Sequence, residues 1–404
     1  MKYALHLRSI SYKTLTLREL PELVKKKMIE YTLINTKKML EHQCEGLKKQ
    51  NKIAMDLEAD SMHHFKEKVC LVQIADSNGP FLVDPLSVHD LSSLKPIMED
   101  DGIVKIFHGS DFDIRSLDRD FNIKINHLFD TEIACRFLGI QKRSLAALLQ
   151  KYFKLTVDKT FQKTDWSRRP LSKDMISYSI NDVAYLIELY EILKKRLERT
   201  GRLAWAEEEF ELQTRVRYEN NGEEPLFLKF KGAGRMSRKN LAALENLLMV
   251  RKKIATQKDR PLFKVISAES IRKMAEELPD SMGKLERASA LSPHQMKMYG
   301  GDCLKAIVKA LETDEDDLPF YPRKKATAPD PNLSNRIKAL KQMRVSASKI
   351  TGIEPGFLIS NATITSIASV SPRSQEELGK INALKNWQID ILGKDIIKTM
   401  AFCC

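Results

Sequence analysis

Carboxylates and one tyrosine are distributed over three segments of the sequence in a pattern that could bind metal ions. Asp56 and Glu58 lie two residues apart in one apolar stretch, and Asp113 follows a second apolar stretch. Tyr178 and Asp182 lie four residues apart in a segment with helical spacing. Residues two apart on a strand, or four apart on a helix, share a face, so these side chains could converge on one pocket.

Four carboxylates in one pocket would repel one another and raise each other's pKa values unless cations neutralise them. Mg²⁺ and Mn²⁺ are hard cations that prefer such oxygen ligands. Two such ions about 3.5–4 Å apart can clamp a phosphodiester, one activating a water and the other stabilising the leaving oxygen. Tyr178 could orient that water without acting as a full base, because a phenol has a pKa of about 10. These residues therefore predict a metal-dependent nuclease.

The elements that must position these residues form a mixed α/β pattern. Short apolar segments separated by turn residues predict strands, and apolar residues at helical spacing predict helices. The predicted strands are Lys52–Ala59, Val69–Asp76, Pro80–Asp84, Val104–His108 and Leu128–Asp130. The predicted helices are Asp111–Phe121, Thr131–Leu138, Ser144–Phe153 and a long one from about Leu171 to Arg199. Strands that come first and then alternate with helices indicate one domain of ordinary size.

The C-terminal half of the sequence repeats itself. Arg251 and Gln295 recur as Arg344 and Gln388, in each case 93 residues later. The same separation relates Ala275, Pro279, Leu285, Leu291, Gly300 and Asp302 to Ala368, Pro372, Leu378, Leu384, Gly393 and Asp395. The shared positions mix apolar, small and polar types, which argues against coincidence. The pattern predicts two copies of one small helical domain.

The chain divides into six expected segments. These are an N-terminal extension at 1–30, the α/β domain at 31–205, a linker at 206–233, the first helical domain at 234–314, a linker at 315–331 and the second helical domain at 332–404. Acidic, Asn and Gly residues make the first linker poor core material. Prolines and like charges favour an extended second linker. Met28 could be the true start, with the first 27 residues dispensable.

Charge and composition restrict the class of protein further. The 404 residues carry a formal charge of +13, which favours a polyanionic partner. The six cysteines form no C-x-x-C pair, which is typical of a reducing cytoplasm. Cys70 and Cys135 should be buried, and Cys403 and Cys404 should form a frayed tail. No apolar run is long enough to span a bilayer, so we expect a cytoplasmic monomer without membrane contact.

The motifs resemble those of the DEDDy 3′–5′ exonucleases of the ribonuclease D family. The resemblance covers residues from about 31 to 205. It rests on Ile53–Glu58, Val69–Ile74, His108–Asp113, Phe129–Thr131, Thr164–Leu171 and Tyr178–Asp182. The implied fold is ribonuclease H-like, a mixed sheet flanked by helices. The two repeats resemble helicase-and-RNase-D C-terminal (HRDC) domains, the first copy more closely than the second.

The resemblance also implies the roles of the site residues. Asp56, Glu58, Asp113 and Asp182 would bind two divalent ions, Mg²⁺ or Mn²⁺, and Tyr178 would orient the water. The implied reaction hydrolyses RNA from its 3′ end and releases nucleoside 5′-monophosphates. The implied substrates are transfer-RNA precursors and other small structured RNAs. In the family, the helical domains assist substrate binding; the alternative is that they are structural caps.

Four further residues are candidate substrate contacts: Leu57, His63, His64 and Arg169. The alternative for the two histidines is a solvated loop, and basic residues such as Arg169 usually belong to solvated faces.

Three positions have competing interpretations. Asp111 competes with Asp113 as a ligand, and the spacing from His108 in the family pattern selects Asp113. Asp130 is better interpreted as an N-cap than as a ligand. Trp166 is better interpreted as a buried support than as a base-stacking element.

Two other functions stay open at this point. A DNA exonuclease shares the same acids, and a degenerate nuclease could serve as an RNA-binding scaffold. A helicase also carries such C-terminal domains, but the sequence contains no G-x-x-x-x-G-K-[ST] phosphate loop.

Overall fold

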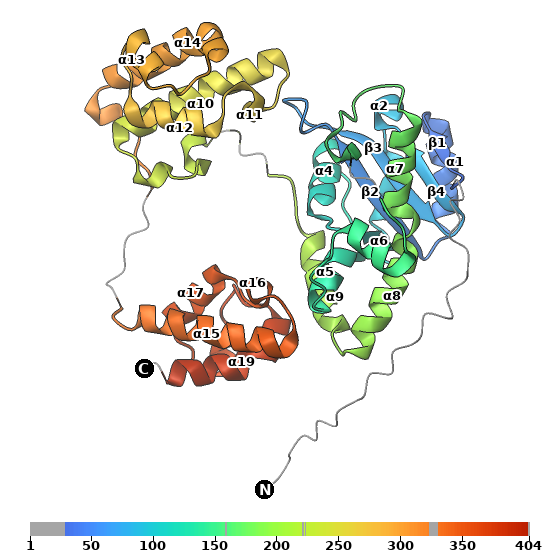
Figure 1. Cartoon of the computed structure of the whole chain (residues 1–404). Coiled ribbons are helices and arrows are strands. Elements are labelled where there is room, and N and C mark those ends of the chain that lie inside the picture. The colour runs from blue at the N-terminus through green and yellow to red at the C-terminus, as the bar shows by residue number, and fades with distance from the viewer. Residues whose placement is uncertain (1–28, 158–159, 220–221, 223, 323–329, 403–404) are drawn as a thin grey trace.

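The computed structural model describes residues 29–157, 160–219, 222, 224–322 and 330–402. They form an α/β domain followed by two helical domains (Figure 1). The proposed start at Met28 and the pair Cys403 and Cys404 lie outside the described residues. Cys70 and Cys135 are buried, as predicted.

A six-stranded mixed sheet forms the centre of the α/β domain. The strands are β1 (Thr32–Ile34), β2 (Lys52–Ala59), β3 (Val69–Asp76), β4 (Gly79–Val83), β5 (Val104–Phe107) and β6 (Leu128–Asp130), in the order β1-β4-β3-β2-β5-β6. β3 is antiparallel to β2 and β4, and the other neighbouring pairs are parallel. The five predicted strands are confirmed. β1 was missed because its three residues are too few to show alternation.

The helices of this domain pack on the sheet through separate apolar clusters. They are α1 (Lys37–Leu47), α2 (Pro85–Val88), α3 (Lys95–Met98), α4 (Asp111–Phe121), α5 (Thr131–Phe137), α6 (Leu145–Phe153), α7 (Lys173–Ala184), α8 (Leu186–Arg199) and α9 (Leu203–Thr214), with 3₁₀ turns η1 (Ser92–Leu94) and η2 (Thr160–Lys163). Met55 and Leu57 of β2 belong to the large cluster that also holds residues of α1 and α4. Leu71 of β3 belongs to the cluster that holds Met175 and Ile180 of α7. Helix α7 therefore contacts β2, β3 and β4 from the other face of the sheet (Figure 1).

The predicted long helix from Leu171 to Arg199 is two helices. α7 ends at Ala184 and α8 begins at Leu186, because Tyr185 has φ −115° and ψ 3°, outside the helical region. The apolar spacing continues through this break, so the sequence pattern did not reveal it. The break allows α7 to stay on the sheet while α8 packs against α5.

The predicted linker at 206–233 is wrong in its first part. Helix α9 buries Ala206 and Phe210 and contacts β6 and α5. Glu209, in the acidic run that suggested a connector, is itself buried. Its carboxylate accepts hydrogen bonds from Lys385 Nζ at 2.6 Å and Trp387 Nε1 at 2.7 Å in the second helical domain.

In the described residues, five α-helices recur in the same order in the two helical domains. The first consists of η3 (Leu226–Lys229), η4 (Ala233–Arg235), α10 (Arg238–Lys258), α11 (Leu262–Val265), α12 (Ala268–Glu277), α13 (Met282–Arg287) and α14 (Pro293–Glu312), followed by η5 (Glu315–Asp317). The second consists of α15 (Leu333–Thr351), α16 (Pro355–Leu358), α17 (Asn361–Val370), α18 (Gln375–Gly379) and α19 (Asn386–Ala401). Each helix from α16 to α19 begins 93 residues after its counterpart among α11 to α14. The predicted duplication is confirmed.

Equivalent side-chain contacts support the duplication. Arg251 donates to the carbonyl of Ile266 at 3.3 Å, and Arg344 donates to that of Ile359 at 2.8 Å. Gln295 and Gln388 likewise each donate to a backbone carbonyl at 2.9 Å. The two copies are therefore held by the same internal hydrogen bonds.

The second expected linker, 315–331, begins as packed structure. Leu318 is buried beside Ala242 and Ala310, and the Tyr321 hydroxyl donates to the carbonyl of Leu228 at 3.1 Å. Residues 323–329 lie outside the described part of the chain.

Candidate metal-binding active site

Three carboxylates from β2 and α7 lie together on the α7 face of the sheet. One side-chain oxygen each from Asp56, Glu58 and Asp182 lies within 4.8 Å of the other two. Asp56 and Glu58 are half-buried and Asp182 is buried. Strand alternation aligns the first two acids, and α7 brings the third over them. Acids that are 126 positions apart in the chain (56 and 182) are thus brought together as the sequence predicted.

The fourth acid, Asp113, comes from the first turn of α4 and is 6% exposed. Burial raises its pKa well above the usual range, and the nearby Asp56 charge raises it further. The backbone amide of Leu57 acts in the opposite direction on both of these carboxyl groups. Asp111 is instead exposed and pairs with Arg115 at 2.9 Å. Asp113, and not Asp111, is therefore the acid whose charge interacts with Asp56 and Glu58, although it is not one of the three acids whose oxygens lie within 4.8 Å of one another.

Burial and mutual repulsion make this a site of raised pKa values. Burial raises the pKa of Asp56 to about 7. Burial, with repulsion from the other three acids, raises the pKa of Glu58 to about 10. Burial and the charge of Asp56 raise the pKa of Asp182 well above its usual range. A divalent cation would relieve this repulsion, and an all-oxygen donor set fits hard ions of the Mg²⁺ and Mn²⁺ type.

Tyr178 lies one helical turn before Asp182 on α7, and its hydroxyl is a hydrogen-bond partner of that carboxylate. Burial, then the charges of Asp182 and Glu58, raise the pKa of the phenol. The hydroxyl therefore stays protonated and is suited to donate a hydrogen bond rather than to act as a base. The Tyr178 ring centroid is 6.0 Å from that of Trp166 and 5.9 Å from that of Phe161. Trp166 is 1% exposed, which fits the predicted buried support.

Asp130 has the structural role that the sequence predicted. It caps α5 by accepting hydrogen bonds from the amides of Glu132 and Ile133, at 2.8 and 3.2 Å. It also accepts from the amides of Gly109 and Ser110, at 3.0 and 2.7 Å. This carboxylate therefore fixes the turn that leads into α4 and positions Asp113.

The structure contradicts the predicted substrate contact at Arg169. Its guanidinium forks around Asp84, with Nε and Nη2 at 2.8 and 2.7 Å from the two carboxylate oxygens. The remaining N–H groups donate to the carbonyls of Trp166, Arg168 and Cys70 at 2.7–2.8 Å. All five donors are used within the protein, so none is left for a phosphate.

Leu57 has its side chain in the core at 6% exposure and reaches the site only through its backbone. A contact between that backbone and substrate stays a prediction.

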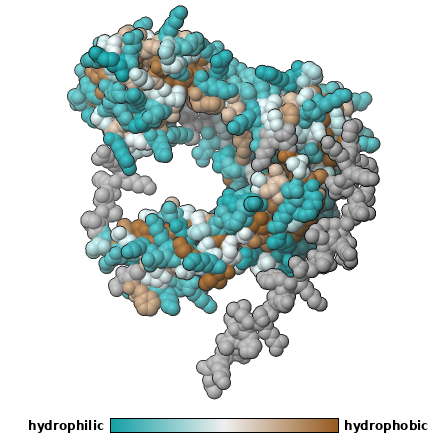
Figure 2. All heavy atoms as spheres, viewed as in Figure 1, coloured by the Kyte–Doolittle hydropathy of each residue, from teal (hydrophilic) through white to brown (hydrophobic). Residues whose placement is uncertain are grey.

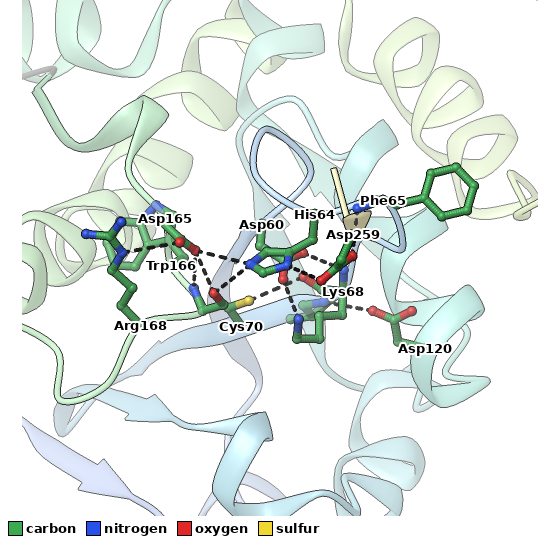
Figure 3. A network of polar contacts seen from close by, with 12 residues as sticks. Asp60, His64, Phe65, Lys68, Cys70, Asp120, Asp165, Trp166, Arg168 and Asp259 are labelled. Atoms are coloured by element: carbon green, nitrogen blue, oxygen red, sulfur yellow. Dashed lines mark hydrogen bonds and ion pairs between the residues drawn. The ribbon is translucent and has the colours of Figure 1, made fainter. Parts of the chain in front are cut away.

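His63 and His64 lie in the loop between β2 and β3 and contact protein groups. His63 Nε2 is 2.9 Å from the carbonyl oxygen of Lys163. His64 Nδ1 is 2.7 Å from Asp259 Oδ2, and its Nε2 is 3.0 Å from Ser167 Oγ (Figure 3). A solvated loop does not describe His64, and a substrate contact by either histidine stays a prediction. The sequence gave no signal for its partner Asp259, which is 195 residues away in the first helical domain.

Comparison with known families assigns the main parts of the chain. Residues 31–198 match the 3′–5′ exonuclease family. Residues 240–307 and 334–400 both match the HRDC domain.

Similar curated proteins share most of the chain. The ribonuclease D of Desulfotalea psychrophila is 27% identical over 82% of this chain and 88% of that protein. The ribonuclease D of Escherichia coli is 27% identical over 89% of this chain and 91% of that protein. The Exosome complex component 10 homolog of Caenorhabditis elegans is 30% identical over 69% of this chain but only 32% of that protein.

Solved structures show the same architecture. The crystal structure of Escherichia coli RNase D, an exoribonuclease involved in structured RNA processing, matches with a TM-score of 0.72 and 25% identity. The match covers 93% of this chain and 99% of that chain. A protein from Bifidobacterium adolescentis shares the fold with a TM-score of 0.74.

The mixed sheet with its cluster of acids defines the first domain as a ribonuclease H-like 3′–5′ exonuclease, a class that depends on divalent metal ions. With two HRDC domains following it, the chain has the domain arrangement of the ribonuclease D proteins that it resembles and is a hydrolytic 3′–5′ exoribonuclease. The resemblance of the sequence motifs is thereby confirmed. In the part of the chain that the structure describes, no helix is long and apolar enough to cross a membrane.

Proposed function

We propose that this chain trims the 3′ ends of transfer-RNA precursors and other small structured RNAs, using two divalent ions held by Asp56, Glu58, Asp113 and Asp182. The observation that carries the proposal is the approach of three carboxylate oxygens, from Asp56, Glu58 and Asp182, to within 4.8 Å. The buried Asp113 interacts electrostatically with Asp56. The relatives named ribonuclease D support RNA as the substrate class. The expected products are nucleoside 5′-monophosphates.

Mg²⁺ or Mn²⁺ in this site supplies the Lewis-acid chemistry that activates water and stabilises the leaving 3′-oxygen. The protein contributes the arrangement of the donors. The charge of Asp56 acts on both Asp113 and Asp182, and Glu58 is repelled by all three other acids, so the four carboxylates form one electrostatic cluster. The protonated Tyr178 shares its one O–H with Asp182 in the metal-free site, and would donate it to the attacking water once Asp182 binds an ion, restricting the direction of approach.

We further propose that the protein works as a monomer in the cytoplasm. The described cysteines, Cys44, Cys70, Cys135 and Cys303, are all free and buried. This usage fits a reducing compartment.

The activity is tested with a 5′-labelled RNA and a DNA of the same sequence, each incubated with Mg²⁺, Mn²⁺ or chelator. We expect metal-dependent shortening of the RNA from its 3′ end. Asp56→Asn should lower the rate by about a thousandfold or more, because it removes one of the charged ligands. Asp111→Asn is the matched control, since this exposed acid lies two residues from a proposed ligand and pairs with Arg115. Equal digestion of DNA would favour a DNA exonuclease, and binding without digestion a scaffold.

The substrate class is tested with a transfer-RNA precursor that carries a 3′ trailer. An unstructured RNA of equal length serves as the comparison. The proposal expects a higher kcat/KM for the precursor trailer, and equal values would contradict the proposed substrate class.

A further inference from the structure

The β2–β3 loop, residues 60–68, follows the strand that carries Asp56 and Glu58 and contacts the first HRDC domain. Phe65 of this loop packs against the apolar cluster of that domain. The Phe65 amide donates to Asp259 Oδ1 at 3.0 Å. Asp259 is the residue that ends α10 of the HRDC domain. The first HRDC domain therefore contacts the exonuclease domain where the chain leaves the metal-binding strand.

His64 lies at the centre of this contact, between Asp259 on one side and Asp165 with Ser167 on the other (Figure 3). The Ser167 hydroxyl donates to Asp165 Oδ1 at 2.6 Å, so its oxygen is left to accept from His64 Nε2 at 3.0 Å. The Asp259 carboxylate, 2.7 Å from Nδ1, can only accept. Its hydrogen bond with His64 lowers the pKa of Asp259, which keeps this acid ionised. Both ring nitrogens of His64 are therefore donors in this arrangement.

Residues 160–168, here called the aromatic segment, connect His64 to the catalytic tyrosine. Phe161 and Trp166 of this segment pack beside the Tyr178 ring, with centroids 5.9 and 6.0 Å away. His63 holds the same segment to the β2–β3 loop through the carbonyl of Lys163 at 2.9 Å. A hydroxyl can orient a water only if its ring is fixed, so the contacts of this segment bear on the direction of the Tyr178 hydroxyl.

We infer that His64 is a positioning residue for the reaction. By joining Asp259 of the first HRDC domain to Ser167 of the aromatic segment, it fixes the segment that packs against Tyr178. The docked first HRDC domain thereby supports catalysis without contributing a side chain to the acid cluster. This inference rests on the proposed function, because it gives a structural cause for the role assigned to Tyr178.

Asp259→Asn tests the link from the HRDC side, because this exposed residue lies in a different domain from the proposed ligands. Kinetics are measured with Mn²⁺ and a trinucleotide RNA, which is short enough to engage little beyond the active site. We expect kcat to fall about tenfold with KM within about twofold of wild type. His64→Gln should behave alike. The rise in Tm caused by Mn²⁺ should match wild type in both variants, because the acids are intact.

Asp280→Asn is the matched control, since Asp280 is an exposed acid of the same domain that pairs with Lys284 of that domain. Its kcat should equal that of wild type.

Two outcomes would overturn the inference: unchanged kcat in both variants, or an increase in KM alone. An increase in KM alone would mean that the contact serves RNA binding only. An inactive wild-type protein would instead overturn the proposed function. The two failures are therefore distinguishable in one set of assays.

Discussion

At the scale of single residues, the acids and the tyrosine of the site have opposite requirements. Asp56 and Glu58 must be ionised to bind metal, yet burial raises the pKa of Asp56 to about 7, and burial with repulsion raises that of Glu58 to about 10. Tyr178 must keep its proton, and the same surroundings raise its pKa too. A bound cation reverses the first effect by neutralising the acids.

Tyr178→Phe removes the hydroxyl and keeps the ring that packs against Trp166 and Phe161. We expect kcat on RNA to fall about a hundredfold, because the water loses its orienting hydrogen bond. Calorimetric titration with Mn²⁺ should give wild-type affinity. Tyr185→Phe, at the junction of α7 and α8, is the control and should keep full activity. Full activity in Tyr178→Phe would remove the tyrosine from the mechanism.

Metal binding should release protons. A carboxyl whose pKa is raised on folding contributes stability below its ordinary pKa and loses it as pH rises through the folded value. For the metal-free protein that window runs from 3.8 to about 7 for Asp56 and from 4.5 to about 10 for Glu58. Mn²⁺ should therefore raise Tm more at about pH 8 than at about pH 6.

Calorimetry at a single pH provides a second measurement of this linkage. The observed heat of Mn²⁺ binding should differ between buffers of different ionisation enthalpy. Identical heats in both buffers would show that no proton is exchanged and would contradict the raised pKa values.

The spacing of the acids was sufficient to predict the cluster, because periods of two and four are geometric properties of strands and helices. The roles of Arg169 and His64 were not predictable. Their partners Asp84 and Asp259 lie 85 and 195 residues away in the sequence, and a local sequence pattern cannot predict a contact between such distant residues. A basic or histidine side chain looks the same in sequence whether it faces a phosphate or a buried carboxylate.

At the scale of elements, the sequence patterns gave a wrong prediction where a tertiary contact determined whether a polar segment is packed or exposed. The five strands with clear apolar runs were predicted, whereas α9 was taken for a linker because of its acidic run. Glu209 of that run is buried and accepts hydrogen bonds from Lys385 and Trp387, so this acid helps to pack α9 against the second HRDC domain. The break at Tyr185 was missed for a related reason, because the apolar period survives a change of direction.

Glu209→Ala should destabilise the interface between α9 and the second HRDC domain. It leaves the Lys385 ammonium and the buried Trp387 N–H without their acceptor. We expect the free energy of unfolding to fall by about 2–3 kcal/mol, measured by urea denaturation with tryptophan fluorescence. Glu207→Ala, an exposed acid of the same helix, should change it by less than about 0.5 kcal/mol. Equal effects of the two substitutions would contradict this role of Glu209.

At the scale of the whole molecule, the two HRDC domains are attached to the exonuclease domain in different ways. The second shares one continuous apolar cluster with it, in which the Phe137 ring centroid is 5.1 Å from that of Phe357 and 5.0 Å from that of Trp387. The first is held largely through the β2–β3 loop, with Phe65 packed on its separate cluster. Figure 2 shows an open space between the two HRDC domains.

Phe65→Asp should release the first HRDC domain, because a carboxylate at this position would have to be buried against an apolar cluster. The radius of gyration from small-angle X-ray scattering should increase, while the second HRDC domain stays attached. Phe263→Asp changes an exposed phenylalanine of the first HRDC domain and should leave the scattering unchanged. An unchanged radius for Phe65→Asp would mean that other contacts hold the domain.

The equivalent hydrogen bonds of Arg251 and Arg344 allow the same substitution to be compared in the two HRDC domains. Each guanidinium closes a loop of the same span, 15 residues, inside the same small domain. Substitution of either arginine by alanine removes this hydrogen bond to a backbone carbonyl, in two domains that have different neighbours. Domains that share one apolar cluster should unfold cooperatively. Arg251→Ala should therefore lower the stability of the first HRDC domain alone, whereas Arg344→Ala should lower the stability of the second HRDC domain together with the exonuclease domain. The three domains should therefore unfold in two cooperative transitions.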